Sequence, residues 1–374
     1  MQKIQMLDLK TQYKRIKPEI DDALINCLNS AEFINGNIVK QFANNLAAYL
    51  QVKHVIPCAN GTDALQIAMM ALGLKEGDEV IVPAFTYVAP AEAAALLKIT
   101  PVFVDVEKDI YNINVEKIRS AINHKTKAIV AVHLFGQSCD MESIMKIAEE
   151  NNLFVIEDNA QAIGCRVNFA NKKANTGTIG HINCTSFFPS KNLGGFGDGG
   201  AITTNNDTLA EKARMIANHG QKIKYLHEII GINSRLDSLQ AAVLDIKLKH
   251  LDEYISKRQE VGKLYDELLK DIEGIEIPER VSYSDHVFHQ YTIKVKNNLR
   301  DPLKTYLQKK EIPAMIYYPL PIQEQKAYQN IAISSSELTN TVELCKSVLS
   351  LPMHTELDPE QIQYIASALR TFFI

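Results

Sequence analysis

The sequence predicts an α/β protein with a large domain, built on a mixed, mostly parallel sheet flanked by helices, and a smaller C-terminal α+β domain. Short runs rich in β-branched residues alternate with amphipathic stretches from about residue 54 onward, which is typical of parallel strands joined by helices. A second, shorter set of such segments follows residue 245. A chain of 374 residues is long enough to bury a core in each part. We therefore expect domains at residues 1–245 and 246–374.

In the large domain, each expected strand precedes a stretch with apolar residues three and four positions apart, the spacing of one helix face. The expected strands are 54–57, 79–82, 102–106, 128–132 and 154–157, and the expected helices are 64–74, 89–98, 115–123 and 141–151. Two more strands, 180–188 and 200–204, surround a glycine-rich turn and precede a helix at 209–218. Helices are also expected at 17–28 and 39–50, separated by a polar break at 33–37.

In the small domain, a long helical stretch is expected to lead into alternating strands and helices. The helical stretch covers 235–269, and the expected elements after it are strand 290–296, helix 302–310, strand 314–318 and helix 359–370. Strands separated by helices in so short a chain indicate a small α+β unit.

Composition excludes several classes of function. The formal net charge of −4 provides no basic field that would attract nucleic acid or an anionic membrane. The six cysteines include no Cys-x-x-Cys pair, which argues against a metal site and against a dense disulfide framework. No apolar run reaches membrane-spanning length, and the first residues do not form a signal peptide. We expect a soluble, cytoplasmic protein that binds no metal.

One lysine, Lys191, lies between an expected strand and a turn dense in glycine. The stretch reads Ser186-Phe187-Phe188-Pro189-Ser190-Lys191-Asn192-Leu193-Gly194-Gly195-Phe196-Gly197-Asp198-Gly199-Gly200. Glycines allow close approach of the backbone to a ligand. A lysine attacks an aldehyde only when its amine loses its proton, which burial promotes. The alternative is a surface lysine in a mobile loop, and no Walker phosphate-binding motif occurs here.

A second candidate, Asp158, ends an expected buried strand in Phe154-Val155-Ile156-Glu157-Asp158-Asn159-Ala160-Gln161. Ligands of open α/β sheets bind beyond the carboxyl ends of the strands. A carboxylate at this point can keep the pyridine nitrogen of pyridoxal phosphate protonated, so that the ring withdraws electrons. Gln161, three residues on, could contact the phenolic oxygen of that ring. The alternative is that Asp158 only caps the following turn.

Two further segments end expected strands of the same sheet. Cys58-Ala59-Asn60-Gly61-Thr62-Asp63 opens a helix, whose free N–H groups and positive dipole end suit a phosphate. Pro83-Ala84-Phe85-Thr86-Tyr87 places aromatic rings at the same edge, where one could stack on a cofactor. Each segment also has an ordinary interpretation, as a turn with a helix cap and as core packing respectively.

In combination, the order and spacing of these motifs resemble the fold-type I enzymes that use pyridoxal phosphate. Over nearly its whole length the chain resembles the DegT/DnrJ/EryC1/StrS aminotransferases of nucleotide-sugar biosynthesis, from Met6-Leu7-Asp8-Leu9 and Phe33-Ile34-Asn35-Gly36 onward. The resemblance implies that Lys191 forms the Schiff base with pyridoxal 5'-phosphate, that Asp158 pairs with the pyridinium nitrogen, that Gln161 contacts the ring oxygen and that Tyr87 stacks on the ring. Gly61, Thr62 and Ser186 would then bind the cofactor phosphate.

The resemblance also implies a homodimer with shared active sites. Asn233 would reach the cofactor phosphate of the neighbouring subunit, and Arg235 would lie near the substrate in that shared site, unless it forms a structural salt bridge with Asp237. One departure concerns the sugar-contacting loop, where Tyr317-Tyr318-Pro319-Leu320-Pro321-Ile322-Gln323 stands in place of a histidine-containing motif. Tyr317 and Tyr318 are the expected substrate residues. Tyrosine and glutamine still offer hydrogen bonds to a sugar, but no group that ionises near neutral pH.

The expected function is transfer of an amino group from glutamate to a nucleotide-linked keto sugar with a UDP or dTDP carrier. Overall similarity favours amination at C3. Such a reaction belongs to the biosynthesis of amino sugars, cell-surface polysaccharide, lipopolysaccharide or O-antigen. The alternatives are a dehydratase that uses the same cofactor, which would have a histidine in place of Lys191, and a catalytically idle sensor of the same fold. A nicotinamide dehydrogenase would need Gly-x-Gly-x-x-Gly after an early strand, where this chain has Cys-Ala-Asn-Gly-Thr.

Overall fold

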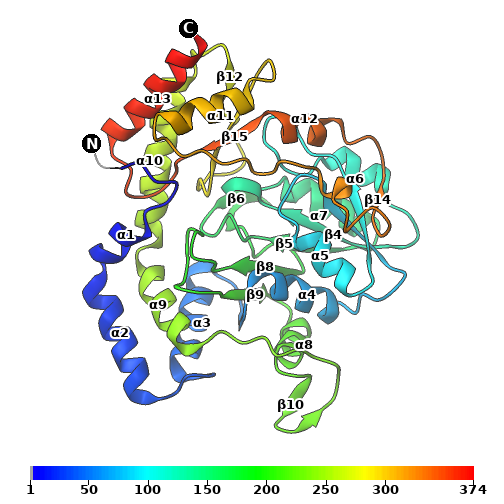
Figure 1. The fold of residues 1–374 in the computed structure, drawn as a ribbon. Helices are drawn as coiled ribbons and strands as arrows, with labels where there is room; N and C mark the ends of the chain where they lie inside the picture. The colour runs from blue at the N-terminus through cyan, green and yellow to red at the C-terminus, as the bar shows by residue number, and fades with distance from the viewer. Residues whose placement is uncertain (1–2) are drawn as a thin grey trace.

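An eight-stranded sheet forms the centre of the computed structural model, which describes residues 3–374 (Figure 1). Only β9 runs antiparallel to both of its neighbours, β1 and β8, and the remaining strand pairs are parallel. The expected mixed, mostly parallel sheet is therefore confirmed. In spatial order the strands are β1 (His54–Cys58), β9 (Gly200–Thr204), β8 (Ile182–Ser186), β5 (Phe154–Asp158), β4 (Thr126–Val132), β2 (Glu79–Pro83), β3 (Thr100–Val104) and β14 (Ile333–Ser334).

Helices cover both faces of this sheet because successive side chains of a strand point to opposite faces. On β2, Val80 and Val82 join one apolar cluster, whereas Ile81 joins another. The first cluster is covered by α4 (Gly61–Ala71), α5 (Ala89–Leu96) and α8 (Asp207–Ala217), and the second by α6 (Val115–Ala121) and α7 (Met141–Glu150). The buried strands are apolar on both faces for this reason.

Three N-terminal helices precede the large sheet, and the last of them packs against β1. They are α1 (Leu9–Arg15), α2 (Lys17–Ser30) and α3 (Asn37–Leu50), and α2 and α3 both contact α9 (Ser238–Lys249). The helical stretch expected at 235–269 is not continuous, because α9 is followed at His250 by a separate helix, α10 (Leu251–Leu269). The break separates two packing partners, since α9 packs on the N-terminal helices and α10 on α13 (Pro359–Phe373).

A three-stranded antiparallel sheet forms the C-terminal part, in the order β12 (Ile275–Glu276), β13 (Tyr291–Val295) and β15 (Val348–Leu351). Its apolar cluster also includes side chains of α10, α11 (Arg300–Lys309) and α13, together with Ile4. Helix α12 (Thr339–Ser347) leads into β15. Because α9 runs through residue 245, the division of the chain into domains at that residue stays a prediction.

The strand expected at 314–318 is wrong. In this segment only Met315 makes an isolated bridge, to Ser350, and the third strand of the small sheet is β15 instead. Pro313 and Pro319 flank the segment and lack the N–H that a strand ladder needs. The chain therefore leaves the sheet after Met315, and this departure carries Tyr317 and Tyr318 to the large domain.

Several short elements were not expected from the sequence. They are the hairpins β6 (Arg166–Phe169) with β7 (Lys172–Asn175) and β10 (Gln221–Ile223) with β11 (Leu226–His227), and the 3-10 turns η1 (Leu134–Gly136) and η2 (Ile322–Glu324). Within the described residues 3–374, no helix combines the length and the apolar character needed to cross a bilayer.

A buried carboxylate, Asp105, ties the C-terminal segment to the end of β3. Its oxygens accept hydrogen bonds from the backbone N–H groups of Asn340 and Thr341, at 2.9 and 2.8 Å, and from the Thr341 hydroxyl at 2.7 Å. Asp105 thereby caps the beginning of α12, next to the point where β14 joins the edge of the large sheet.

We expect Asp105→Ala to lower the free energy of unfolding by about 2–3 kcal/mol, because it leaves buried donors without an acceptor. Urea unfolding followed by circular dichroism measures the change. Asp22→Ala, on an exposed position of α2, is the control and should change stability little. Equal stabilities of the two variants would contradict the capping role of Asp105.

Candidate active site

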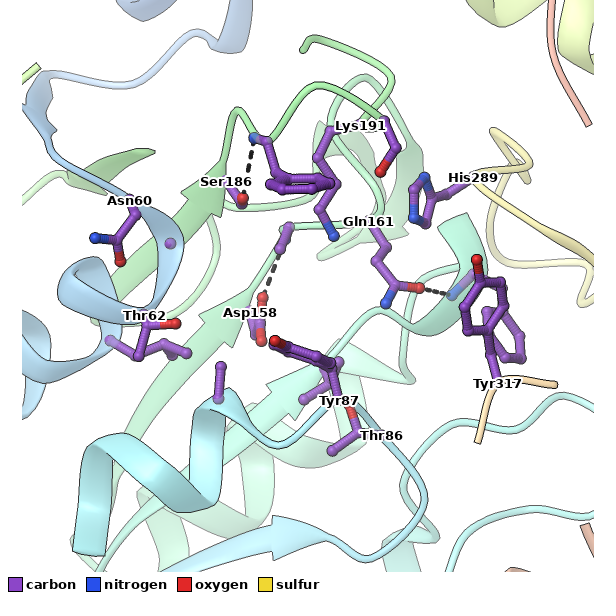
Figure 2. A pocket seen from close by; sticks show the side chains of 18 of the residues that line it. Asn60, Thr62, Thr86, Tyr87, Asp158, Gln161, Ser186, Lys191, His289 and Tyr317 are labelled. Carbon is purple, nitrogen blue, oxygen red and sulfur yellow. Dashed lines mark hydrogen bonds between the residues drawn. The ribbon is translucent and has the colours of Figure 1, made fainter. Parts of the chain in front are cut away.

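A cavity of about 520 Å³ opens at the carboxyl ends of the central strands (Figure 2). This is where ligands bind in open α/β sheets. Tyr317 and Tyr318 reach it from the C-terminal part of the chain. Most of the site residues predicted from the sequence line it together: Gly61, Thr62, Tyr87, Asp158, Gln161, Ser186, Lys191, Tyr317 and Tyr318.

One wall of the cavity is the N-terminus of α4. The Asn60 side chain accepts a hydrogen bond from the Asp63 N–H at 2.8 Å, so Asn60 is the N-cap and the preceding N–H groups of the first turn remain free. A Cβ on Gly61 would lie 2.7 Å from Cβ of Ser186, so glycine is required where the helix start meets the end of β8. The free N–H groups, the helix dipole and the Ser186 and Thr62 hydroxyls form an anion site.

Asp158 ends β5 and is buried, at 7% exposure. One of its carboxylate oxygens accepts the Ala160 N–H at 3.0 Å. Burial raises the pKa of Asp158, while the Ala160 N–H and the nearby Lys191 partly oppose this effect. A carboxylate in this environment is stabilised by a cationic group placed against it in the cavity.

Behind Asp158, the neighbouring Glu157 is held by hydrogen bonds on the opposite face of β5. Its oxygens accept the N–H groups of Gly177, Ile179 and Gly180 at 2.8, 2.6 and 2.7 Å. They also accept the Nε2–H of His133 at 2.8 Å, because Nδ1 of this histidine accepts the Cys139 N–H. Burial alone would raise the pKa of Glu157, but the His133 and backbone donors outweigh it and the pKa lies below its usual value.

Lys191 projects into the cavity from a tightly folded loop. Its backbone N–H bonds to the carbonyl of Phe188, and the Gly195 N–H bonds to that of Phe187, both at 2.8 Å. A Cβ on Gly194 would lie 2.4 Å from the Pro189 oxygen, so the turn requires glycine there. Burial lowers the pKa of Lys191 to about 8, against the opposing effect of Asp158. The neutral, nucleophilic amine is therefore far more populated near neutral pH than it is for an exposed lysine.

The amide of Gln161 has a fixed orientation. Its oxygen accepts the Phe135 N–H at 2.8 Å, and its Nε2 donates to the Tyr318 hydroxyl at 3.2 Å. The amide therefore presents an N–H to the cavity side, in keeping with the predicted contact to a ring oxygen. Tyr87 is half exposed at the same rim and leaves one ring face open to a ligand.

Two predicted residues do not line this cavity. Asn233 is exposed and makes an isolated bridge with Asn218, and Arg235 is partly buried nearby. Their predicted role concerns the site of a second subunit and stays a prediction. Sequence analysis missed several residues that do line the cavity, which are Thr86, Phe188, Ser190, Asp198, His289 and Gln290. The first four lie inside the quoted motifs, whereas His289 and Gln290 arrive through tertiary folding and carry no local signal.

Comparison with known proteins identifies the family. The family model described as the DegT/DnrJ/EryC1/StrS aminotransferase family matches residues 14–370. The chain belongs to this family. It is 44% identical over 99% of its length to a pleiotropic regulatory protein of Geobacillus stearothermophilus, covering 98% of that protein. It is 43% identical over 98% of its length to the UDP-2-acetamido-2-deoxy-3-oxo-D-glucuronate aminotransferase of Pseudomonas aeruginosa, covering 99% of that enzyme.

Solved structures, including one of a DegT/DnrJ/EryC1/StrS aminotransferase, share the fold closely. A member from Brucella abortus superimposes with a TM-score of 0.95 at 40% identity, over 99% of both chains. The NtdA protein of Bacillus subtilis, solved with bound pyridoxamine phosphate, gives a TM-score of 0.89 at 31% identity, over 98% of this chain and 83% of that one. The protein is therefore a fold-type I aminotransferase, and its cofactor is pyridoxal phosphate.

The residues of the cavity fit this cofactor. The anion site at α4 matches its phosphate, Asp158 matches its pyridine nitrogen and Lys191 its aldehyde. In addition, the hydroxyl of Thr86 is buried in the cavity wall without a hydrogen-bond partner among residues 3–374. Buried polar atoms without partners are rare in a folded protein and indicate a place where a ligand completes the structure.

We expect Glu157→Gln to lower the free energy of unfolding at pH 7 by about 3 kcal/mol, because an uncharged amide replaces an anion that four donors stabilise. The folded-state pKa of Glu157 is depressed, so its contribution is present above the unfolded carboxylate pKa and is lost as pH falls through the folded one. The gap between the two proteins should therefore narrow below about pH 4.

Urea titrations of both proteins at several pH values measure this gap, with Glu142→Gln at an exposed position of α7 as the control. A gap that stays constant with pH would mean that the charge of Glu157 does not stabilise the fold.

Proposed function

We propose that the protein transfers an amino group from glutamate to the 3-keto group of a sugar linked to UDP or dTDP. The observation that carries the proposal is Lys191, an amine with a pKa of about 8 that shares one buried cavity with Asp158 and a helix N-terminus. Two relatives support the substrate class: the Pseudomonas enzyme above and, at 42% identity over 98% of this chain, the UDP-N-acetyl-3-dehydro-α-D-glucosamine 3-aminotransferase of Acidithiobacillus ferrooxidans, of which 97% is covered.

Each wall of the cavity has one task in this reaction. Gly61, Thr62 and Ser186 bind the phosphate of pyridoxal phosphate, and Tyr87 covers one ring face. Asp158 would keep the pyridine nitrogen protonated, and Gln161, whose amide N–H lies on the cavity side, would donate to the ring oxygen. When bound, the cofactor supplies an aldehyde that accepts amines and a ring that withdraws electrons from the reacting carbon.

Lys191 holds the cofactor between reactions and moves the proton during them. Its neutral amine, which burial favours, would take the proton from the α-carbon of glutamate and deliver it to the aldehyde carbon of the cofactor. In the second half-reaction the same amine transfers a proton in the reverse direction, after the keto sugar has entered. Tyr317 and Tyr318 line the cavity from the C-terminal part of the chain and offer hydroxyls to the sugar.

A homodimer completes this site in the proposal. Among the described residues that line the cavity, Lys191 is the only lysine or arginine, although glutamate carries two carboxylates. Arg235 and Asn233 of a second subunit would supply the missing donors. The hairpin of β10 and β11 extends from the molecule in Figure 1, and it and the segment after it expose large apolar side chains that a partner would bury: Ile223, Tyr225, Leu226, Ile229 and Ile230.

The reaction fits the cytoplasm, where nucleotide sugars are available, and the amino sugar would serve cell-surface polysaccharide, lipopolysaccharide or O-antigen synthesis. All six cysteines are free thiols, in keeping with a reducing compartment.

Neither of the two rival functions, the dehydratase and the idle sensor, has comparable support. The related dehydratases would have a histidine where this chain has Lys191. A catalytically idle sensor agrees with the name of the Geobacillus relative, a pleiotropic regulatory protein. Such a sensor, however, would not require a buried amine facing Asp158.

We expect Lys191→Ala to abolish both transamination and the visible absorption of the covalently bound cofactor, because no other lysine of the described residues 3–374 lines the cavity. Lys263→Met, at an exposed position of α10, should keep the visible band. Spectra of the purified proteins with added pyridoxal phosphate decide the matter. An unchanged band in the Lys191→Ala protein would show that Lys191 does not form the covalent bond with the cofactor.

The shared site makes a second prediction. Lys191→Ala and Arg235→Ala are each expected to be inactive, but refolding an equal mixture should restore about a quarter of the wild-type activity, because half the dimers are hybrids with one intact site. The measurement is the rate at which a panel of UDP- and dTDP-linked 3-keto sugars accepts the amino group taken from glutamate. If Arg235 served its own subunit, the mixture would stay inactive.

A further inference from the structure

His289 lines the cavity with an imidazole that is almost wholly buried, at 6% exposure. Its Nδ1 is fully buried and has no hydrogen-bond partner within residues 3–374, whereas Nε2 is not among the buried atoms without a partner. A buried ring nitrogen of histidine normally has a hydrogen-bond partner. The buried Nδ1 of His289 has none in the described chain. Because Nδ1 faces the protein interior, Nε2 is the nitrogen that can reach the cavity.

The backbone around His289 is fixed from two directions. The Val287 N–H donates to the Gly136 carbonyl at 2.8 Å, and the Gln290 N–H donates to that of Phe135 at 3.3 Å. From the loop that carries Lys191, Asn192 donates to the Val287 carbonyl at 3.0 Å. The imidazole is therefore held in place beside the reactive lysine, and Figure 2 shows His289 and Lys191 projecting into the same cavity.

Directly behind His289 lies a fully buried cation, Arg258, at 2% exposure. Its Nη1 donates to the carbonyl of Phe288, the residue before His289, at 2.9 Å and to that of Met353 at 3.1 Å. No carboxylate within residues 3–374 pairs with it, and its Nε has no acceptor. Burial lowers the pKa of Arg258 only to about 10, so the guanidinium remains charged at neutral pH.

This cation restricts the imidazole to one form. Burial, Lys191 and Arg258 together lower the pKa of His289 well below its usual value, so the ring is neutral and carries a single N–H. A positive charge attracts a lone pair and repels an N–H. Nδ1 is the fully buried nitrogen, so the lone pair is expected there and the proton on Nε2, toward the cavity.

Among the described residues, Lys191 is the only lysine or arginine that lines the cavity, and the other titratable side chains there are Asp158, Asp198 and three tyrosines. An Nε2–H of His289 would therefore add a donor to a cavity that has a single cationic side chain. A carboxylate that leaves water for this cavity needs hydrogen-bond donors, and a neutral donor binds it without competing for the proton that Lys191 carries.

We infer that Arg258 holds His289 as the neutral Nε2–H tautomer and that this N–H donates a hydrogen bond to a carboxylate oxygen of the amino-acid donor or of its keto-acid product. The inference rests on the proposed function, since it assumes that glutamate is the donor. His289 is then a substrate-binding residue, and Arg258 is a positioning residue that acts through it.

Kinetics of variants test the carboxylate contact. His289→Phe keeps the ring and removes the N–H, and it should raise KM for glutamate and for 2-oxoglutarate about 10- to 100-fold, the effect of one hydrogen bond to a charged group. His289→Gln, which places an amide N–H near the position of Nε2, should recover most of this loss. An unchanged KM for both acids, or an increase confined to the nucleotide sugar, would overturn the inference.

The tautomer is measured without cofactor or turnover. In the protein labelled with ¹⁵N-histidine, two-dimensional NMR that correlates ring nitrogens with ring protons should show His289 neutral and protonated on Nε2 at pH 7, with His289→Phe assigning the signal. Arg258→Lys should keep this state, because it keeps the charge. If the wild-type spectrum instead shows His289 as an imidazolium, or with its proton on Nδ1, the inference is overturned. This outcome does not depend on whether any Arg258 variant folds.

The two experiments also separate this inference from the proposed function. Wild-type protein that accepts no amino group from glutamate would contradict the proposed function, whatever the NMR spectrum shows. Wild-type protein that accepts it, together with a His289→Phe variant of normal KM, would overturn only the role of His289.

Discussion

An amine and a carboxylate that share one cavity make opposite demands on the protein, and the architecture around the cavity satisfies both. Burial drives the amine of Lys191 toward its neutral form and raises the pKa of Asp158. If the two groups met in a close ion pair, each would hold the other charged and the amine would lose its nucleophilic character. The fold instead places them on separate elements, the end of β5 and the loop after β8. The space between them is left for a ligand.

Such a separation depends on rigid supports behind each group. Alternation along β5 sends Asp158 into the cavity and Glu157 to the other face, where four donors fix it. The loop of Lys191 is fixed by glycines that no larger residue could replace and by Lys247, whose ammonium donates to the Gly194 carbonyl at 2.6 Å. Neither Glu157 nor Lys247 reaches the cavity, so their effect on chemistry is through geometry and electrostatics.

The sequence predicted the parts of the site that are local in the chain. Asn60, Gly61 and Thr62 follow one strand, Asp158 ends another and Lys191 lies in its own loop, so pattern and turn chemistry were sufficient. The strand expected at 314–318 failed because apolar and aromatic residues there serve the cavity rather than a sheet, and flanking prolines prevent pairing. His289, Gln290 and Arg258 could not be predicted, because a buried histidine or arginine becomes meaningful only when folding shows what lies opposite.

The segment that carries Tyr317 and Tyr318 is attached to the scaffold at both of its ends. Met315 bridges Ser350 of the small sheet, and Ile333 of β14 pairs with Val102 at the edge of the large one. Residues 316–332 therefore span the gap between the two sheets, and Ile322 and Tyr328 within them pack into the core of the large one. A change of length or sequence here would act on the cofactor side as well as on the rim of the cavity, because Tyr318 accepts the hydrogen bond that orients Gln161. The same segment ends in β14, which covers the edge of β3 and so protects it from unwanted strand pairing.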